Sequence, residues 1–191
     1  AGIILALGRR SKMTVIRVLC VAFIELFRSV PLITILFMAT TMFPLFLPGG
    51  MVIDKLASAI VAVCLFAAAY MAEVVRGGLQ AIPKGQYEAA EAVGLTYWQA
   101  TVLIVMPQAL KFMIPNIVGN FMGLLKDTTL VSIIGLYDLL GMINAVSHDP
   151  KWIGLHHEPL FTAAVIFFIG CFTMSKYSQH LERTLGAGNN R

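Results

Sequence analysis

Residues 88–107, EAAEAVGLTYWQATVLIVMP, lie between two long apolar runs and lack the composition of a membrane span. Pro83, just upstream, is placed to open a short helix. Gly94 should end this helix after about two turns, because glycine readily adopts the left-handed conformation found beyond helix C-termini. Thr96 and Gln99 have the spacing of a capping box, which predicts that a second short helix begins there. The stretch therefore predicts a helix, a tight glycine bend and a helix, presented at a membrane surface.

The composition around this stretch is that of an integral membrane protein. Of the 191 residues, 58% are hydrophobic and 13% are charged, and the mean hydropathy is +0.81, whereas about a quarter of the residues in soluble domains are charged. The apolar runs are long and unbroken, which favours helices over an outer-membrane type of β-barrel. The net charge is +4, but the basic residues are scattered beside the apolar runs. Their placement argues against a nucleic-acid partner and for a lipid bilayer.

Four complete membrane spans and the end of a further one are expected. Residues 1–7 are too short to cross a bilayer, which needs about 20 apolar residues, and are interpreted as the end of a truncated first span. The complete spans are expected at 13–41, 56–79, 107–131 and 159–176, with a non-spanning loop at 82–106 and a tail at 177–191. Met106 and Pro107 should turn the chain from the loop into the third complete span, and residues 186–191 should be disordered.

Basic residues beside the spans predict the orientation in the membrane. Arg9, Arg10 and Lys12 follow the truncated span, and Lys176 and Arg183 follow the last one. Lysine and arginine are enriched on the cytoplasmic side of membrane proteins. Both of these ends and the loop at 82–106 are therefore expected in the cytoplasm.

Charged and helix-bending residues within the spans are candidates for function. Pro31 should kink the first complete span. Arg28 follows Glu25 by three residues, and Arg76 follows Glu73 by three, so the members of each pair can share a helical face. For Glu25 and Arg28, a gating or substrate role and a simple position at the membrane interface both remain open. For Glu73 and Arg76, a structural ion pair is favoured.

The third complete span combines flexible residues with charges. Pro115, Gly119 and Gly123 predict bending and close backbone approach, as in a helix that lines a pathway. Lys126 and Asp127 follow, and they have the charges to meet the carboxylate and ammonium of a zwitterion. Neighbouring residues on an α-helix point about 100° apart, so facing one ligand together requires a local distortion. Pairing between helices is the alternative role.

Residues 135–158 are expected to form a short helix followed by a solvated external loop. The segment contains His148, His156 and His157, but the last two are neighbours rather than one helical turn apart, and no matching ligand set accompanies them. The three cysteines of the chain are isolated within apolar runs, which argues against disulfides and metal ligation. No metal site is therefore expected.

The stretch at 88–107 resembles the cytoplasmic "EAA" loop of the membrane subunits of ATP-binding-cassette (ABC) importers. That motif reads Glu-Ala-Ala, three residues, Gly, nine residues, Ile, one residue, Leu-Pro, and its spacing is kept here with Met106 in place of Leu. The motif residues in this chain are Glu88, Ala89, Ala90, Gly94, Ile104 and Pro107. The resemblance implies that the first short helix docks in a groove of a separate ATPase subunit. The alanines would allow close approach, and Glu88 would meet polar groups of the partner.

Three further segments resemble permeases for polar amino acids. They are RSVPL at 28–32, AYMAEVVRGGLQ at 69–80 and KDTTL at 126–130. The segment from Met174 to Arg183 resembles the general L-amino acid permease branch. The candidate residues of a translocation pathway are Arg28, Pro31, Lys126, Asp127 and Thr128.

The resemblance implies an all-α integral membrane fold, the type I ABC importer transmembrane core, with about five helices of which the first is truncated here. It implies a multi-pass permease subunit of an amino acid importer in a bacterial inner membrane, with a cytoplasmic C-terminus. The expected partners are a dimer of ABC ATPase subunits, a second permease subunit that is the same or related, a periplasmic amino acid-binding protein and the amino acid itself. The chain has no G-x-x-x-x-G-K-[ST] phosphate loop. No catalytic residue and no cofactor are therefore expected on it, and ATP should be bound by the partner.

Two other functions remain as alternatives. An ion-coupled secondary transporter would use Glu25, Glu73, Lys126 or Asp127 as proton or sodium sites, and it leaves the loop at 82–106 unexplained. A membrane-embedded enzyme would use the polar cluster at 148–158 and would require a bound metal. The importer interpretation instead predicts a transport subunit without an ATPase site of its own.

Overall fold

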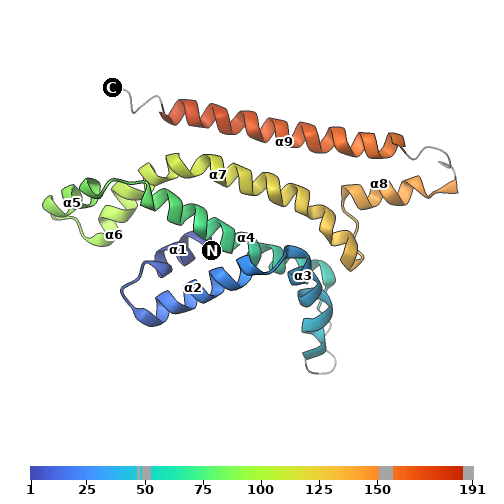
Figure 1. Cartoon of the computed structure of the whole chain (residues 1–191), viewed down its shortest axis with the longest axis horizontal. Helices are drawn as coiled ribbons and strands as arrows, with labels where there is room; N and C mark the ends of the chain where they lie inside the picture. The colour runs from blue at the N-terminus through green and yellow to red at the C-terminus, as the bar shows by residue number, and fades with distance from the viewer. Residues whose placement is uncertain (47, 49–52, 151–156, 187–191) are drawn as a thin grey trace. The chain divides into compact units, whose positions relative to one another are not determined.

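The computed structural model describes residues 1–46, 48, 53–150 and 157–186, and every regular element in these ranges is helical (Figure 1). The α-helices are α1 (Gly2–Arg9), α2 (Thr14–Ser29), α3 (Leu32–Phe37), α4 (Lys55–Gln80), α5 (Lys84–Ala92), α6 (Tyr97–Ala100), α7 (Met106–Asp127), α8 (Leu139–Ser147) and α9 (His157–Gly186). Two π-helical segments, Met38–Met42 and Thr101–Val105, and two 3₁₀ segments, Phe43–Phe46 and Thr128–Ile134, adjoin them. Residues 151–156, which include His156, lie outside the described residues, as do residues 187–191 of the tail expected to be disordered at 186–191. Gly186, the first residue of that tail, is the last residue of α9, so the prediction is wrong for it.

The chain forms two compact units, each assembled from separate segments. Unit 1 comprises Ala1–Glu25, Ala68–Asn120 and Ser175–Arg191, and unit 2 comprises Leu26–Ala67 and Phe121–Met174. Helices α2, α4, α7 and α9 each contribute residues to both.

Small residues bring the helices of unit 1 close together. Ala72 of α4 and Ala6 of α1 are buried in the same core, and a Cβ on Gly2 would lie 2.8 Å from the Cβ of Met71. Small side chains allow helix backbones to approach closely in a lipid environment, where the hydrophobic effect does not drive association. The buried core residues of this unit are Ala6, Ile24, Ala72, Val75, Leu79, Ile82, Val105, Ala109 and Met113. Helices α1, α2, α4 and α7 therefore share one core.

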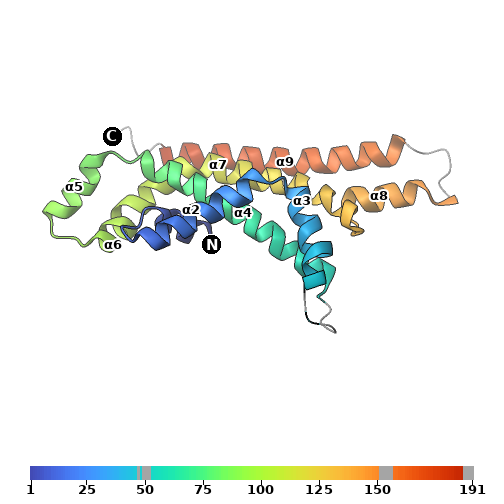
Figure 2. The same ribbon diagram turned by 60° about the horizontal axis from the view of Figure 1, so that its bottom comes forward.

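Unit 2 has its own core, in which α3 packs beside the first half of α4 (Figure 2). Leu32 and Leu36 of α3 are buried together with Ala59 and Ala62 of α4, and Ile134 at the end of the second 3₁₀ segment completes the cluster.

The chain breaks sharply at Pro31. Helix α2 ends at Ser29, α3 begins at Leu32, and the two directions differ by 103°. A proline lacks an N–H donor and disfavours helical conformation in the residue before it, which explains why α2 ends before Pro31. Pro31 itself is the extended N-cap of α3, with φ −59° and ψ 143°. The expected kink is confirmed, but it is a break, so the expected single span at 13–41 is two helices.

Within the described residues, three helices are long and apolar enough to cross a membrane: Lys55–Gln80, Tyr97–Ile134 and His157–Leu185. The bent pair Thr14–Ser29 and Leu32–Phe46 adds a fourth if it is one span. The last of these helices extends well beyond the span expected at 159–176 and reaches Gly186. Its final turns contain good helix formers such as Leu181, Glu182 and Arg183. The fall in hydropathy near residue 176 predicts where the chain leaves the apolar layer. It does not predict where the helix ends, because the backbone hydrogen bonds of the helix continue beyond that point.

The loop at 82–106 begins with the predicted helix and glycine bend. Helix α5 starts directly after Pro83, and Gly94, two residues beyond its end, has φ +77°. The Gly94 N–H donates to the Glu91 carbonyl at 2.9 Å, and the Leu95 N–H donates to the Ala90 carbonyl at 3.1 Å. This pair of bonds is a Schellman motif, which satisfies carbonyls that the helix end would otherwise leave without donors.

A capping box then starts α6, as the sequence predicted. The Gln99 N–H donates to Thr96 Oγ1 at 3.4 Å, and the Thr96 N–H donates to Gln99 Oε1 at 2.9 Å. Because both side chains satisfy backbone or side-chain groups of the first turn, the helix has a fixed starting point.

The prediction that Met106 and Pro107 turn the chain is wrong, since the helical path runs without interruption from Tyr97 to Ile134. A π-helical turn lies just before Pro107, in which the Met106 N–H donates to the carbonyl of Thr101, five residues back. This wider turn shifts the carbonyls that a proline ring would clash with in a regular α-helix.

We expect the Gly94→Ala substitution to weaken the α5–α6 bend. An alanine at φ +77° costs about 1–2 kcal/mol, and the cost should appear as faster proteolytic cleavage between α5 and α6 in the folded protein. Gly85→Ala is the matched control, because a Cβ at Gly85 meets nothing within 4 Å and its φ is not left-handed. Equal cleavage rates in the two variants would contradict the assignment of the bend to Gly94.

The neighbouring glycines of α4 provide a test of the unit 1 core. A Cβ on Gly78 would meet the Met113 side chain and would lie 3.0 Å from the backbone oxygen of Ala109, whereas a Cβ on Gly77 would meet nothing within 4 Å. Gly78→Ala should therefore destabilise the full-length protein by about 1–3 kcal/mol, and Gly77→Ala should not. Thermal unfolding in detergent would show the difference, and equal midpoints would contradict this packing.

Candidate functional site

The residues of the Glu-Ala-Ala motif lie on two sides of α5. Glu88 and Ala89 are exposed, whereas Ala90 is buried. Val93, directly after the helix, is also exposed. Helix α5 therefore presents a carboxylate and small apolar side chains outward while its buried alanine seats it against the rest of unit 1.

The last two residues of the motif, Ile104 and Pro107, lie in the helical segments that follow the glycine bend. Ile104 is half-buried in the π-helical turn, next to the fully buried Val105, and Pro107 is exposed in the first turn of α7. The carbonyl of Ile104 accepts a hydrogen bond from Gln108 Nε2 at 3.0 Å. Gly94 forms the bend between the two parts.

An aromatic pair that sequence reasoning missed adjoins this surface. Tyr97 and Trp98 begin α6, have exposed fractions of 53% and 62%, and pack edge to face with ring centroids 5.6 Å apart. Exposed aromatic side chains with a polar end are characteristic of protein interfaces and of membrane boundaries. The signal was available in the sequence, since a Tyr-Trp pair beside a polar loop is conspicuous.

Side chains tie α5 to three other elements of unit 1. The Tyr87 hydroxyl accepts a hydrogen bond from Arg10 Nη1 at 3.3 Å and lies 3.4 Å from the Leu79 carbonyl, to which it donates. The Arg10 guanidinium also lies 5.7 Å from the centre of the Tyr87 ring, within range of a cation–π interaction. Gln108 Nε2 of α7 donates to Gln86 Oε1 at 3.0 Å. The candidate docking helix is thus attached to Arg10, directly after α1, and to α4 and α7.

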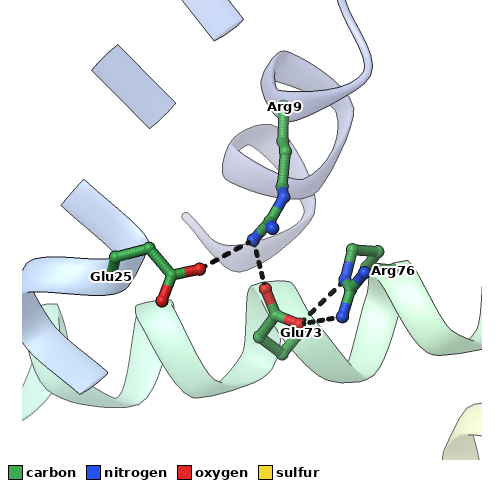
Figure 3. Close-up of polar contacts among 4 residues, drawn as sticks. All are labelled: Arg9, Glu25, Glu73 and Arg76. Carbon is green, nitrogen blue, oxygen red and sulfur yellow. Dashed lines mark hydrogen bonds and ion pairs between the residues drawn. The ribbon is translucent and has the colours of Figure 1, made fainter. Parts of the chain in front are cut away.

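A cluster of four charges lies in the same unit (Figure 3). Arg9 Nη1 of α1 is 2.5 Å from Glu73 Oε1 of α4 and 3.4 Å from Glu25 Oε1 of α2. Arg76 binds the other oxygen of Glu73, through Nε at 2.8 Å and Nη2 at 2.7 Å. The side chain of Glu73 is 14% exposed and that of Glu25 is 56% exposed. Glu73 is therefore the shielded centre of the cluster, and Glu25 is its solvent-facing edge.

The expected ion pair between Glu73 and Arg76 is confirmed. The participation of Arg9 was not predicted, because it lies 64 positions from Glu73 in the sequence. Arg9 was interpreted as a marker of topology, and spacing arguments within one helix do not reach a partner on another helix.

The candidate pathway residues all belong to unit 2. Arg28 and Pro31 are exposed at the break between α2 and α3. Lys126 and Asp127 are the last two residues of α7, with Lys126 exposed and Asp127 half-buried, and Thr128 begins the 3₁₀ segment. Lys126 and Asp127 are thus consecutive α-helical residues, and the change to 3₁₀ geometry begins at the next residue, Thr128.

Hydroxyl groups stabilise this change of helix type. Thr128 Oγ1 donates to the Leu125 carbonyl at 2.8 Å, and Thr129 Oγ1 donates to the Lys126 carbonyl at 2.8 Å. Carbonyls at a helix end need such donors most where water is scarce. The threonines of the segment thus have a structural role of their own.

An apolar groove of about 530 Å³ is found in unit 2. It lies between the end of α2, α3 with its following turns, and the first half of α4, and Ser58 is the polar residue among the lining side chains that the structure describes. Such a lining suits hydrocarbon and offers almost nothing to a zwitterion. Within the described residues, no three His, Cys, Asp or Glu side chains are grouped to hold a metal ion.

The chain was compared with known proteins. The profile of the family described as "Binding-protein-dependent transport system inner membrane component" matches residues 1–186. The inner membrane amino-acid ABC transporter permease protein YhdY of Escherichia coli K12 is 55% identical over 98% of this chain and 51% of its own length. The glutamate/glutamine/aspartate/asparagine transport system permease protein BztC of Rhodobacter capsulatus is 55% identical over 96% of this chain and 43% of its own length.

A solved structure agrees with these sequence relatives. A chain in the "Crystal structure of an amino acid ABC transporter with histidines" superposes with a TM-score of 0.83 and 31% identity, covering 96% of this chain and 83% of that one. This match confirms the expected all-α fold of a type I ABC importer subunit. The chain spans about half the length of the two permeases named above.

The profile match covers nearly the whole chain, and the resemblance first carried by the loop at 88–107 extends to the complete helical fold. The chain therefore belongs to the family of ABC transporter permeases described as binding-protein-dependent transport system inner membrane components.

Proposed function

We propose that this chain is the transmembrane permease part of an ATP-driven amino acid importer and that α5 is its docking site for a separate ATPase subunit. The observation that carries the proposal is the construction of α5. Its outer side presents Glu88 and Ala89, its end is fixed by Gly94, and its inner side is tied to three membrane-associated elements. A helix that is exposed on one side and attached on the other is suited to pass on a movement imposed by a partner.

The partners follow from this role and from the family. ATP binds to and is hydrolysed by the ATPase dimer, so this chain needs no cofactor. One chain offers one docking helix, so two permease subunits, identical or related, engage two ATPase subunits. A periplasmic binding protein delivers the amino acid on the opposite side. The relatives named as amino-acid permeases support the substrate class.

The mechanism is alternating access. Closure of the ATPase dimer draws the two docking helices together, and the attached helices change from an inward-open to an outward-open packing. Such coupling requires two alternative packings of the helical core with different affinities for the partner states. Because the ATPase subunits bind on the cytoplasmic side in this mechanism, α5, α6 and the C-terminus of α9 lie in the cytoplasm.

We place the amino acid pathway beside Lys126, Asp127 and Thr128, with Arg28 and Pro31 as further lining residues. The end of the regular α-helix directly after Asp127 supports this placement, because the side chains from Thr128 onward no longer follow α-helical spacing. Charged groups within membrane helices are costly unless they serve a function or are paired.

Reversing the charge of the docking helix should separate the two subunits. Glu88→Lys in the full-length protein should deplete the co-purified ATPase at least fivefold, while the amount of permease in the membrane stays unchanged. The matched control is Glu158→Lys, the same charge reversal in the first turn of α9. Mild solubilisation from the native membrane, followed by quantification of both subunits, provides the measurement.

The outcomes are distinct. An ATPase that accompanies the wild type and Glu158→Lys but is lost with Glu88→Lys supports the docking assignment. Absence of an ATPase from folded wild-type protein, together with amino acid uptake that follows a proton or sodium gradient, would favour the ion-coupled transporter instead.

A second experiment addresses the pathway. Lys126→Gln should lower amino acid uptake at least tenfold without loss of the co-purified ATPase, because it removes a charge from the proposed pathway and leaves the docking helix intact. Lys111→Gln, which neutralises another exposed lysine of α7, is the control and should transport normally. Normal uptake by Lys126→Gln would remove Lys126 from the pathway.

A further inference from the structure

We propose that two consecutive arginines, Arg9 at the end of α1 and Arg10 directly after it, transmit the movement of the docking helix α5 to α2 and α4. The inference rests on the proposed function and adds positioning residues that lie outside the Glu-Ala-Ala motif. We call these two residues the arginine clasp.

Arg10 is the residue of the arginine clasp that contacts α5. Its guanidinium donates to the Tyr87 hydroxyl at 3.3 Å and lies 5.7 Å from the centre of the Tyr87 ring. Tyr87 immediately precedes Glu88, and its side chain also packs against the core of unit 1. A displacement of the docking helix therefore acts on Arg10 through the residue next to the docking carboxylate.

Arg9 is the residue of the arginine clasp that contacts α2 and α4. It contacts Glu73 of α4 at 2.5 Å and Glu25 of α2 at 3.4 Å, both through Nη1 (Figure 3). Arg9 is the last residue of α1 and Arg10 follows it in α-helical conformation, so their side chains point about 100° apart. The two adjacent residues can thus contact different helices without any break in the backbone between them.

Helix α1 is firmly seated, which makes it a suitable carrier. Ala6 is buried in the unit 1 core, and Gly2 lies against Met71 of α4. A helix packed closely along one side moves together with its neighbours on that side, because close-packed interiors do not deform gradually. A displacement of Arg10 by α5 then also displaces Arg9 and its contacts with Glu73 and Glu25.

The two contacts of Arg9 differ in strength, and this difference indicates which one changes. The contact with Glu73 is short, largely shielded from solvent, and reinforced by Arg76 on the other side. The contact with Glu25 is longer, and the Glu25 side chain is 56% exposed. Exposed ion pairs contribute little to stability, so the Arg9–Glu25 contact is the one that opens and closes during transport, while Arg9–Glu73 is retained.

The experiment uses the full-length permease with its ATPase and binding protein, reconstituted in lipid vesicles. Arg9→Gln and Arg10→Gln are compared with wild type, and Lys12→Gln, which removes an exposed cation from the same segment, is the matched control. Three quantities are measured: the ATPase that co-purifies, the rate of ATP hydrolysis, and the number of amino acids imported per ATP hydrolysed.

We expect both arginine variants to retain the ATPase and to import at least fivefold fewer amino acids per ATP, while Lys12→Gln matches wild type. Arg9→Lys should restore at least half of the wild-type ratio, because a single cationic nitrogen makes both present contacts of Arg9. If Arg9→Gln does not accumulate in the membrane, Glu25→Gln replaces it, since that variant keeps the shielded contact with Glu73 and should show the same fall.

Three results would overturn the inference. An unchanged ratio in the variants would do so while leaving the proposed function intact. A parallel loss of hydrolysis and uptake at a constant ratio, with depletion of the ATPase, would reduce the arginines to a purely structural role. A wild-type protein that carries no ATPase would overturn the proposed function as well.

Discussion

The shielded carboxylate of Glu73 is the constraint around which unit 1 is arranged. A charge on an apolar helix is tolerated only when it is paired, and removal of one partner leaves an uncompensated charge. Glu73 meets this condition with cations from two helices, Arg9 of α1 and Arg76 of α4. The rotation of α4 and the position of α1 are thereby fixed relative to each other. Because Arg10 adjoins Arg9 and contacts Tyr87, the position of α5 also depends on the contact between Arg9 and Glu73.

The features that could be predicted from the sequence are those governed by neighbours along the chain. Pro83, Gly94 and the Thr96–Gln99 pair determine where α5 and α6 begin and end, and each acts on backbone groups no more than a few residues away. The ion pair within α4 has the same local character. Local interactions suffice to specify these features, so the features do not depend on the tertiary contacts around them.

The features that could not be predicted depend on contacts across the fold. Pro107 signals a turn by itself, but the buried Thr101 and Val105 hold a π-helical segment before it, and the helix continues. The position of Pro31 was evident, whereas the 103° angle reflects how α3 packs against α4. The Arg9–Glu73 contact joins residues 64 positions apart, a separation at which spacing carries no information. The roles of Lys126 and Asp127 depend on a ligand and stay predictions.

The bend at Gly94 has a consequence for how such permeases diversify. Its geometry is maintained by two backbone hydrogen bonds and one left-handed glycine, so no side chain on the outer face of α5 is needed to form it. The exposed residues of that face, Glu88 and Ala89 among them, are consequently free of any folding duty at the bend. Mutation can alter the surface shown to a partner without altering the angle at which it is shown. A duplicated permease can in this way acquire a preference for a different ATPase while its docking helix keeps its place.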